Sequence, residues 1–567
     1  MPSVAIVSLQ VQSSYQAVPL AAGCIVSALR ADPSVSSRAS VRLFDFSLED
    51  ARFRGRSPAE IGDGIAETVA RECGSPLMVG FSVYVWNRAA LERAAERLAE
   101  LVPLSSFFAG GPEITAMPAD TRSPFGLLVR GEGESRSRDI VRAWLSGEGD
   151  GRAVEAASDT SRRSPPESLE TLSSPWLDGS LDDSVAVRDH KGALWELARG
   201  CPFGCSYCYE SKGERAVRHF PRERLERELE RFVEKGIERI FVLDPTYNGS
   251  RARALETLAL IERRAPDIHF NFEVRAELLD RELAEAFSRI PCSLQVGLQS
   301  SNAEALKLVN RPSDTRVFAK KIGLLNDAGV VFGLDLMYGL PGDSLSSFRA
   351  SVDFAIDLYP NNLELFRLSV LPGTVLFEEA ASLGIEFSPV PPYHARSNRT
   401  FPAADMARAA ELARATEVFY TQGRAVSWFL AVLRPLKLKS SRFLSDFAGF
   451  LGSPSVKARY SFLAEGSCAD LAHVDAERLQ LAFLETKYAE KGLSWAWPAA
   501  RDLVSINGAW TRAFAEGEST RLDLSYDPED LMGPDAMDLA SFAESAYMET
   551  CSVMVVPGPE GPEIQEC

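Results

Sequence analysis

The stretch ALWELARGCPFGCSYCYES, residues 193–211, runs from an apolar segment into three closely spaced cysteines. Cys201, Cys205 and Cys208 account for a third of the nine cysteines in a chain of 567 residues. The N-terminal segment MPSVAIVSLQ lacks the basic and apolar regions of an export signal, so we expect a cytoplasmic protein. Disulfides are rare in that reducing compartment, and the three thiols are therefore expected to bind a metal centre.

The segment around these cysteines, residues 191–390, repeats a strand–helix pattern six times. Apolar runs that predict strands are followed by helical stretches such as PRERLERELERFVEKG; the runs cover residues 193–200, 239–245, 269–277, 292–300, 330–342 and 363–373. Six units are too few to close an eight-stranded barrel, so the pattern predicts an open, partial (β/α)6 TIM barrel. The cysteines directly follow the first strand, and active sites of such barrels lie at the C-terminal ends of the strands.

The spacing C-x3-C-x2-C favours one kind of metal centre. Structural zinc needs four ligands, but no second CxxC exists, Cys292 is isolated on a predicted buried strand, and His219 would be an irregular fourth ligand. A four-cysteine electron-transfer cluster would also need a further thiolate. Three thiolates on one loop suit a [4Fe–4S] cluster with one open iron, and Pro202 and Gly204 allow a tight loop.

Polar side chains interrupt the predicted barrel strands near their carboxyl ends. Any one of them could belong to a structural ion pair, but together they predict a polar pocket. These residues are Asp244, Glu273, Arg275, Gln295, Gln299 and Asp335.

The motif CPFGCSYC, with Tyr207 before its third cysteine, resembles the signature of radical S-adenosylmethionine (SAM) enzymes. The resemblance implies that the open iron binds the amino and carboxylate groups of SAM. It also implies that a one-electron donor such as flavodoxin or ferredoxin reduces the cluster, which then cleaves SAM to a 5′-deoxyadenosyl radical.

Two further stretches, QVGLQSSNAEALKLVNRPSDT (295–315) and LDLMYGLPGDS (334–344), resemble oxygen-independent coproporphyrinogen oxidase and anaerobic Mg-protoporphyrin ester cyclase. That resemblance assigns Gln299 and Asp335 to the ribose hydroxyls, Arg311 to the methionine carboxylate and Glu273 to the ammonium group. LDPT (243–246) stands where many relatives have GGE, so Asp244 has no assigned role, and LPGT (371–374) is expected near the adenine. The complete set expected to bind the cofactors is Tyr207, Glu273, Arg275, Gln299, Arg311 and Asp335.

Residues 1–146 alternate apolar strands with helices, which predicts a five-stranded, doubly wound, Rossmann-like domain. Ligands of such folds bind beyond the carboxyl ends of the strands, where the loops QVQSSYQAVP, YVWNR, GGPE and GEGE lie. No G-x-G-x-x-G follows the first strand, which argues against a dinucleotide.

This first domain, fused to the barrel, resembles the cobalamin-binding class of radical SAM enzymes. The similar stretches are AVPLAAGCIVSAL (17–29), VGFSVYVWNR (79–88), FAGGPEITAMP (108–118) and VRGEGE (129–134). Many such domains carry a cobalt-ligating histidine in D-x-H-x-x-G, whereas none of the five histidines here lies in that motif or before residue 190. Cobalamin is therefore expected without a protein His ligand; alternatively, the domain keeps the fold and has lost the cofactor.

The remaining segments carry no recognised chemical motif. Residues 147–190 have a linker-like composition, residues 391–555 read as mainly α-helical with strands near LDLSY and CSVMVV, and residues 556–567 as a disordered tail. The helical segment could cover the barrel mouth. The net charge of −18 argues against nucleic acid as a partner, the basic stretch 434–442 is expected to be a solvated face, and no apolar run is long enough for a membrane span.

The sequence favours a cobalamin-dependent radical SAM methyltransferase that acts on an unactivated carbon of a small molecule or peptide. One alternative is a radical SAM cyclase, oxidoreductase or rearrangement enzyme without methyl transfer; another is a non-catalytic iron–sulfur or metal-binding module. Aromatic and histidine residues of the C-terminal half could line a substrate pocket: Tyr393, His394, Trp428, Trp495 and Trp497.

Overall fold

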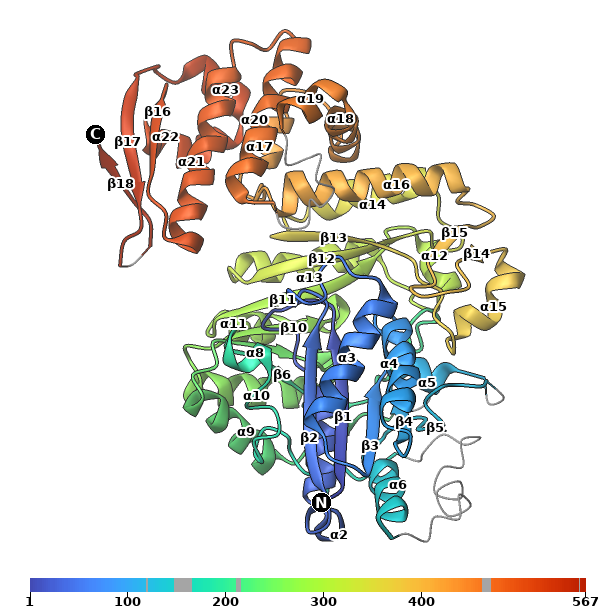
Figure 1. The fold of residues 1–567 in the computed structure, drawn as a ribbon. Coiled ribbons are helices and arrows are strands. Elements are labelled where there is room, and N and C mark those ends of the chain that lie inside the picture. Colours follow the sequence, from blue (N-terminus) through green and yellow to red (C-terminus); the bar gives the residue numbers. More distant parts are fainter. Residues whose placement is uncertain (119–120, 147–165, 211–215, 461–470, 560) are drawn as a thin grey trace.

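The computed structural model describes residues 1–567 except 119–120, 147–165, 211–215, 461–470 and 560. Its N-terminal unit is a five-stranded parallel sheet in the order β2-β1-β3-β4-β5 (Figure 1). The strands are β1 (Ser3–Gln10), β2 (Ser40–Ser47), β3 (Leu77–Ser82), β4 (Ser106–Gly110) and β5 (Leu127–Leu128). The helices are α1 (Leu20–Arg30), α2 (Pro33–Ser36), α3 (Pro58–Glu72), α4 (Arg88–Leu101), α5 (Pro112–Ala116) and α6 (Glu134–Ser146).

Both faces of this sheet are buried, as the apolar strands predict. Val4 and Ile6 of β1 pack with α1, α2 and α6, while Ala5 and Val7 pack with α3 and α4 on the opposite face. Successive strand residues point to opposite faces, so a strand covered on both sides must be apolar throughout. The predicted doubly wound architecture is confirmed.

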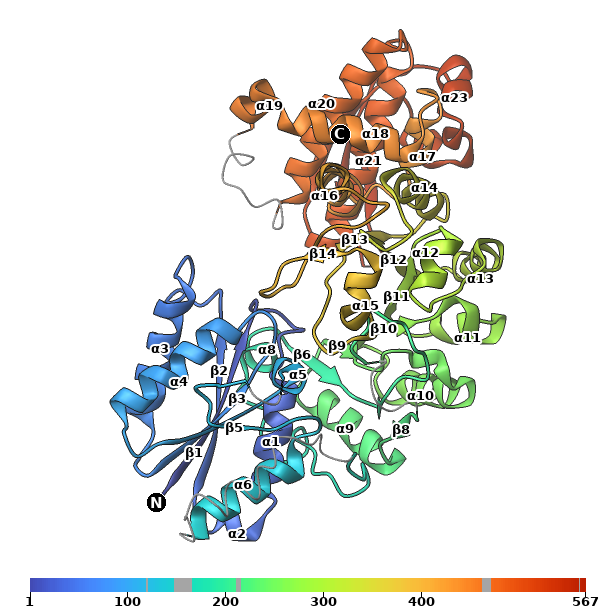
Figure 2. The same cartoon turned by 90° about the vertical axis from the view of Figure 1, so that its right-hand side faces the viewer.

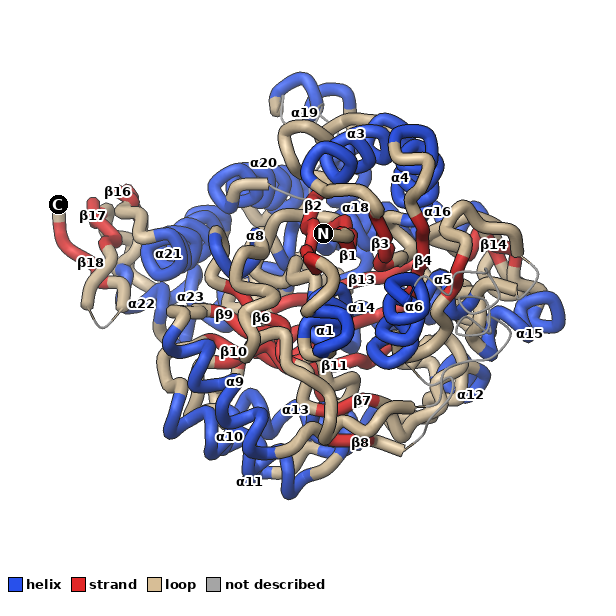
Figure 3. Tube along the Cα trace, turned by 60° about the horizontal axis from the view of Figure 1, so that its bottom comes forward, coloured by secondary structure: helices blue, strands red, loops and turns tan. Residues whose placement is uncertain are grey.

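The central unit is a six-stranded parallel sheet in the order β13-β12-β11-β10-β9-β6. Its strands are β6 (Gly192–Trp195), β9 (Arg239–Val242), β10 (His269–Val274), β11 (Cys292–Gln299), β12 (Val331–Tyr338) and β13 (Asn362–Arg367). Its helices are α8 (Val185–Arg188), α9 (Arg222–Glu234), α10 (Arg251–Arg264), α11 (Arg281–Phe287), α12 (Ala303–Leu308), α13 (Thr315–Asp327), α14 (Leu345–Ile356) and α15 (Val375–Leu383). The strand order follows the chain and does not close, which confirms the open partial barrel (Figure 3).

The barrel strands alternate between an apolar and a polar face. Phe270, Phe272 and Val274 of β10 lie in the main hydrophobic core with the surrounding helices. Asn271 and Glu273 alternate with them and point to the opposite, inner face. The outer face therefore stabilises the barrel, and the inner face is available for chemistry.

The carboxyl edge of the N-terminal sheet faces the barrel (Figure 2). The loop after β1 places the Tyr15 hydroxyl 2.8 Å from Asn271 Nδ2, and the Tyr15 ring lies under the Arg239 guanidinium at 5.3 Å. On α5, Glu113 accepts a 2.8 Å hydrogen bond from the hydroxyl of Tyr393, a residue that follows the last barrel strand. The loops predicted to bind ligands thus lie against the barrel.

The C-terminal unit is mainly helical, as predicted. It contains α16 (Ala403–Thr416), a π-helix (Glu417–Thr421), α17 (Phe429–Leu433), α18 (Ser440–Gly452), α19 (Pro454–Arg459), α20 (His473–Glu490), α21 (Trp497–Glu516), α22 (Pro528–Met532) and α23 (Leu539–Ser545). The expected strands near LDLSY and CSVMVV are β16 (Thr520–Leu524) and β17 (Cys551–Val556), which pair antiparallel. This unit packs along β13, where Thr421 Oγ1 accepts a 3.1 Å bond from Leu363 N. No described helix is long and apolar enough to cross a membrane.

The structure differs from the sequence expectations in two segments. Within 147–190, whose first part lies outside the described residues, Leu169, Trp176 and Leu181 are buried in the main core, because their apolar side chains pack on the barrel instead of lying over the surface. In the tail predicted to be disordered, β18 (Glu563–Glu566) pairs antiparallel with β17. In this pairing, the backbone N–H and C=O groups of the tail bond to β17, a partner that the composition of the tail does not predict.

Candidate active site

The three cysteines lie on a loop between two short antiparallel strands, β7 (Ala198–Arg199) and β8 (Arg218–His219). Gly200 turns the chain into this loop with φ of +98°, a conformation that side chains rarely adopt. Cys201 and Cys205 are buried, Cys208 is half-buried, and no disulfide joins them. The loop follows the first barrel strand, at the face where the sequence places the active site.

Neighbouring barrel segments fix the cysteine loop through its backbone. Asn310 Nδ2 donates to Gly204 O at 2.7 Å. The backbone of Ser206 donates to Val309 O at 3.0 Å and accepts from Leu376 N at 2.8 Å. These bonds come from the segments after β11 and β13, so the loop position depends on strands far away in the chain.

Arg311 reaches the cysteine loop directly. Its Nη1 donates to Cys205 Sγ at 3.8 Å, and its Nη2 donates to Gly297 O at 2.5 Å. Burial alone would lower the pKa of this guanidinium, but Tyr207 and Cys205 outweigh that effect and raise it. Burial also raises the pKa of the Tyr207 hydroxyl, so Tyr207 stays protonated. A buried, fixed positive charge beside the cysteines is suited to bind a carboxylate.

Gln299 ends β11 in an unusual backbone conformation. Its φ is +67°, and the register between β11 and β12 shifts at Gly297 and Gln299. A Cβ on Gly297 would lie 2.5 Å from Gln299 Nε2 and 2.9 Å from Arg311 Nη2. The missing side chain of Gly297 therefore leaves room for the ends of the Gln299 and Arg311 side chains.

Two inward carboxyl groups lie on the strands that flank β11: Glu273 on β10 and Asp335 on β12. Burial raises the pKa of Glu273 to about 7, and the nearby Glu210 adds to the effect. Burial likewise raises the pKa of Asp335 to about 7, even though Gln295 donates a hydrogen bond to it. Neither carboxyl has an ion-pair partner among the described residues. Both are thus poised to ionise when a cationic or hydroxyl-bearing ligand approaches.

Arg275 does not join this inner set. It lies just beyond the end of β10, where its guanidinium stacks on the Phe203 ring of the cysteine loop at 3.8 Å and pairs with Glu277 at 3.4 Å. Arg275 therefore supports the cysteine loop through its contact with Phe203.

Several residues that the sequence left unassigned also hold the site. Asp244 Oδ1 accepts from the backbone N–H groups of Leu197 and Ala198, at 2.9 and 3.0 Å. Arg199 forms a 2.7 Å ion pair with Glu134 of the N-terminal unit. In the sequence, Asp244 lies in the LDPT motif and Glu134 in the GEGE loop, and neither motif indicated these contacts. Of the aromatic candidates, Trp428 belongs to the buried core, so it does not line a pocket.

The donor set fits an open iron–sulfur cluster. Among the described residues, no three His, Cys, Asp or Glu side chains lie close enough together to hold a single metal ion. The three thiols with Arg311 beside them fit a [4Fe–4S] cluster with one open iron.

The carboxyl edge of the N-terminal sheet carries stacked aromatic rings and a hydroxyl group. Tyr84 and Trp86 stack with ring centres 4.5 Å apart, and Trp86 keeps 41% of its surface exposed. Ser13 at the same edge bonds His190, the first histidine of the chain, through its hydroxyl. An exposed aromatic surface and a hydroxyl group are the kinds of groups that could contact a planar, amide-rich corrin.

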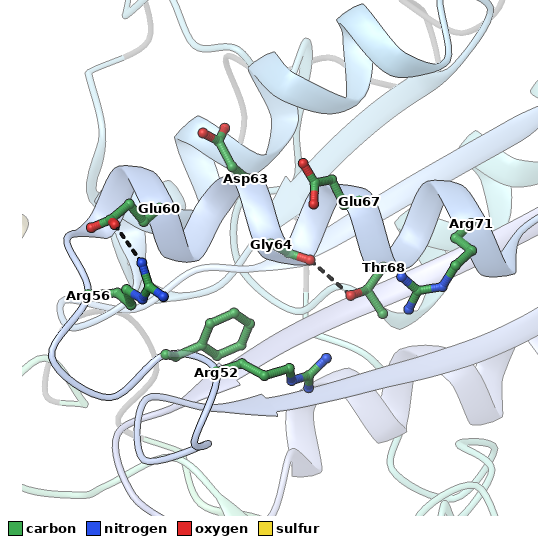
Figure 4. Close-up of a pocket in the computed structure, with 9 residues that line it drawn as sticks. Arg52, Arg56, Glu60, Asp63, Gly64, Glu67, Thr68 and Arg71 are labelled. Atoms are coloured by element: carbon green, nitrogen blue, oxygen red, sulfur yellow. Dashed lines mark hydrogen bonds and ion pairs between the residues drawn. The ribbon is translucent and has the colours of Figure 1, made fainter.

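A surface hollow of about 470 Å³ lies elsewhere, on the outer side of α3 (Figure 4). Its lining carries both signs of charge, including the Arg56–Glu60 ion pair at 3.0 Å. It contains no residue of the cysteine loop. We therefore assign no chemistry to it.

Comparisons with known proteins agree with this geometry. The model of the radical SAM superfamily matches residues 195–355. The chain is 28% identical to 2-(S-pantetheinyl)-carbapenam-3-carboxylate methyltransferase from Streptantibioticus cattleyicolor, over 66% of this chain and 56% of that protein. It is 27% identical to the cobalamin-dependent radical SAM methyltransferase TokK from Streptomyces tokunonensis, over 64% of this chain and 55% of that protein. The chain thus spans little more than half the length of these relatives.

The fold is also that of a solved relative. The structure of the cobalamin-dependent SAM radical enzyme OxsB, with aqua-cobalamin and SAM bound, matches 96% of this chain and 84% of its own. The TM-score is 0.55 at 14% identity, which shows a shared fold. Oxygen-independent coproporphyrinogen III oxidases and Mg-protoporphyrin monomethyl ester cyclases are among the other relatives. The chain therefore carries a radical SAM domain, and cobalamin-dependent radical SAM methyltransferases are among the proteins that it resembles.

Proposed function

We propose that this protein is a cobalamin-dependent radical SAM methyltransferase acting on a small molecule or peptide. The observation that carries the proposal is a juxtaposition. The carboxyl edge of the N-terminal sheet lies against the same barrel that holds the three cysteines and the polar inner face. A corrin at that edge and SAM at the cysteine loop would both reach one substrate.

The charges of the site support recognition of SAM. Arg311, buried beside Cys205, would pair with the methionine carboxylate. Glu273 would lose its proton and pair with the ammonium group. Gln299 and Asp335 would accept hydrogen bonds from the ribose hydroxyls. Each side chain has the charge or hydrogen-bonding capacity that its proposed partner requires.

When bound, the cluster supplies the electron that cleaves SAM, and cobalamin supplies methyl-transfer chemistry. Cys201, Cys205 and Cys208 would hold the cluster and leave one iron for the amino acid end of SAM. The N-terminal unit would exclude water from the barrel through the Tyr15 and Glu113 contacts. The reaction also needs a one-electron donor and a substrate.

Anaerobic reconstitution tests the proposal. Iron and cobalt are counted per chain after loading with iron, sulfide and hydroxocobalamin, and products are then measured with SAM and a reductant. We expect four irons and one cobalt, with release of S-adenosylhomocysteine. Cys205→Ala should lose the iron–sulfur absorbance near ~400 nm and all SAM cleavage.

The outcomes separate the alternatives. Release of 5′-deoxyadenosine without S-adenosylhomocysteine, and no bound cobalt, would replace methyl transfer by another radical reaction. Equal behaviour of Cys205→Ala and the unaltered protein would refute radical chemistry at this loop.

A further inference from the structure

We propose that the loop after β9, residues 244–248, positions the cysteine loop and tunes its cluster through Asp244, Thr246 and Asn248. The inference rests on the proposed function, because it concerns how this chain would hold that cluster. None of the three side chains is proposed to touch SAM or substrate; they act through the cysteine loop.

Asp244 fixes the strand that leads into the cysteines. One oxygen, Oδ1, accepts from Leu197 N at 2.9 Å and Ala198 N at 3.0 Å, and the side chain is 9% exposed. Strand β7 has only two residues and, within the part of the chain that the structure describes, pairs only with β8, so few ladder bonds hold it. A buried carboxylate oxygen that collects two N–H groups takes the place of a missing ladder partner. Cys201 lies three residues after Ala198, so this bond fixes the start of the cysteine loop.

Thr246 contacts the first cysteine directly. Its Oγ1 lies 3.9 Å from Cys201 Sγ and also donates to Pro245 O at 2.8 Å. A hydroxyl can rotate toward the stronger acceptor, and a cluster-bound thiolate is a stronger acceptor than a neutral thiol. A hydrogen bond to a ligand sulfur stabilises the reduced, more negative cluster, so it raises the reduction potential.

Asn248 reaches the other part of the same loop. This residue is 2% exposed; its Nδ2 donates to Arg275 O at 2.9 Å, and its Oδ1 accepts from Arg275 N at 3.0 Å. The clamp sets the direction of the Arg275 guanidinium, which stacks 3.8 Å from the Phe203 ring centre. Phe203 lies between the first two cysteines. One loop therefore holds the cysteine loop at its entry, at its first sulfur and at its aromatic residue.

The decisive variant is Thr246→Val, which keeps the shape and removes the hydroxyl. In the reconstituted protein, we expect full iron content, an unchanged melting temperature before reconstitution, and a more negative midpoint potential in a redox titration followed by electron paramagnetic resonance. Thr246→Ser should keep the potential of the unaltered protein. Thr68→Val, which removes a hydroxyl bonded to Gly64 O at 2.9 Å on distant α3, is the matched control and should shift nothing.

Variants of Asp244 test whether this residue positions the cysteine loop. Asp244→Asn keeps Oδ1 as an acceptor and should retain iron, whereas Asp244→Ala should weaken iron retention against a chelator by about 10- to 100-fold. An unchanged potential in Thr246→Val with full iron would overturn the tuning role, and iron retention in a folded Asp244→Ala equal to that of the unaltered protein would overturn the positioning role. If the unaltered protein assembled no cluster, the proposed function itself would fail.

Discussion

Gly297 offers a sharp test of the proposed SAM site. It lies in β11 and is not among the glycines with positive φ, so alanine fits its backbone. An added Cβ would lie 2.5 Å from Gln299 Nε2 and 2.9 Å from Arg311 Nη2. Both distances are too short, so Gly297→Ala must displace the ends of these two side chains.

The displacement should affect binding far more than stability. Both atoms end flexible side chains, so they can move, and we expect the free energy of unfolding to fall by about 1 kcal/mol or less. Loss of one charge-assisted hydrogen bond from Arg311 to the SAM carboxylate costs about 1.5–3 kcal/mol. This corresponds to a rise of about 10- to 150-fold in the Kd of SAM.

Anaerobic equilibrium dialysis with labelled SAM on iron-loaded protein measures that Kd, and thermal unfolding checks the fold. Gly333→Ala on the neighbouring strand β12 is the matched control, because its Cβ would meet Asn362 Cβ at an ordinary 3.4 Å. The control should bind SAM normally. A contrary result would be a folded, iron-loaded Gly297→Ala variant whose Kd for SAM lies within about twofold of the unaltered protein, a difference of only about 0.4 kcal/mol. In that case Arg311 and Gln299 would not be SAM contacts.

Three further predictions concern the contacts around the site. Tyr393→Phe removes the 2.8 Å bond to buried Glu113 and should lower the free energy of unfolding by about 1 kcal/mol in urea titration. Glu134→Gln weakens the 2.7 Å pair with Arg199 and should cost about 1–3 kcal/mol in the same assay; an unchanged midpoint would show that the pair contributes nothing. The carboxyl of Glu273, whose pKa is about 7, must release its proton to pair with an ammonium group. The Kd of SAM should therefore rise as the pH falls from 8 to 6, and Glu273→Gln should flatten that dependence.

The strands and the cysteine loop could be predicted because their signals are local. A strand covered on both faces is apolar throughout, as in β1, and the barrel strands alternate, as in β10 with Phe270, Asn271 and Phe272. Both patterns follow from the period of two along a strand. The cysteine spacing is equally local, so the cluster loop is visible before any contact is known.

The supports of the loop could not be predicted, because they are contacts between distant segments. Asp244 bonds a strand that lies 46 and 47 residues before it, and nothing in LDPT reveals that partner. Arg275 shares the strand pattern with Glu273, but the strand ends between them and the guanidinium turns to Phe203. Trp176 lies in a segment of linker-like composition, where its burial depends on a ring contact with Phe232 at 5.0 Å.

An open barrel leaves two strand edges and a polar interior to cover, and three parts of this chain share that task. At one edge, the Trp176 ring N–H donates to Leu194 O of β6 at 3.2 Å; at the other, Thr421 accepts from Leu363 N of β13. The N-terminal unit lies over the open side. The raised pKa values of Glu273 and Asp335 arise first from desolvation of these carboxyls inside the barrel. Exclusion of water is also what a radical intermediate requires, so the cover that stabilises the fold serves the proposed chemistry.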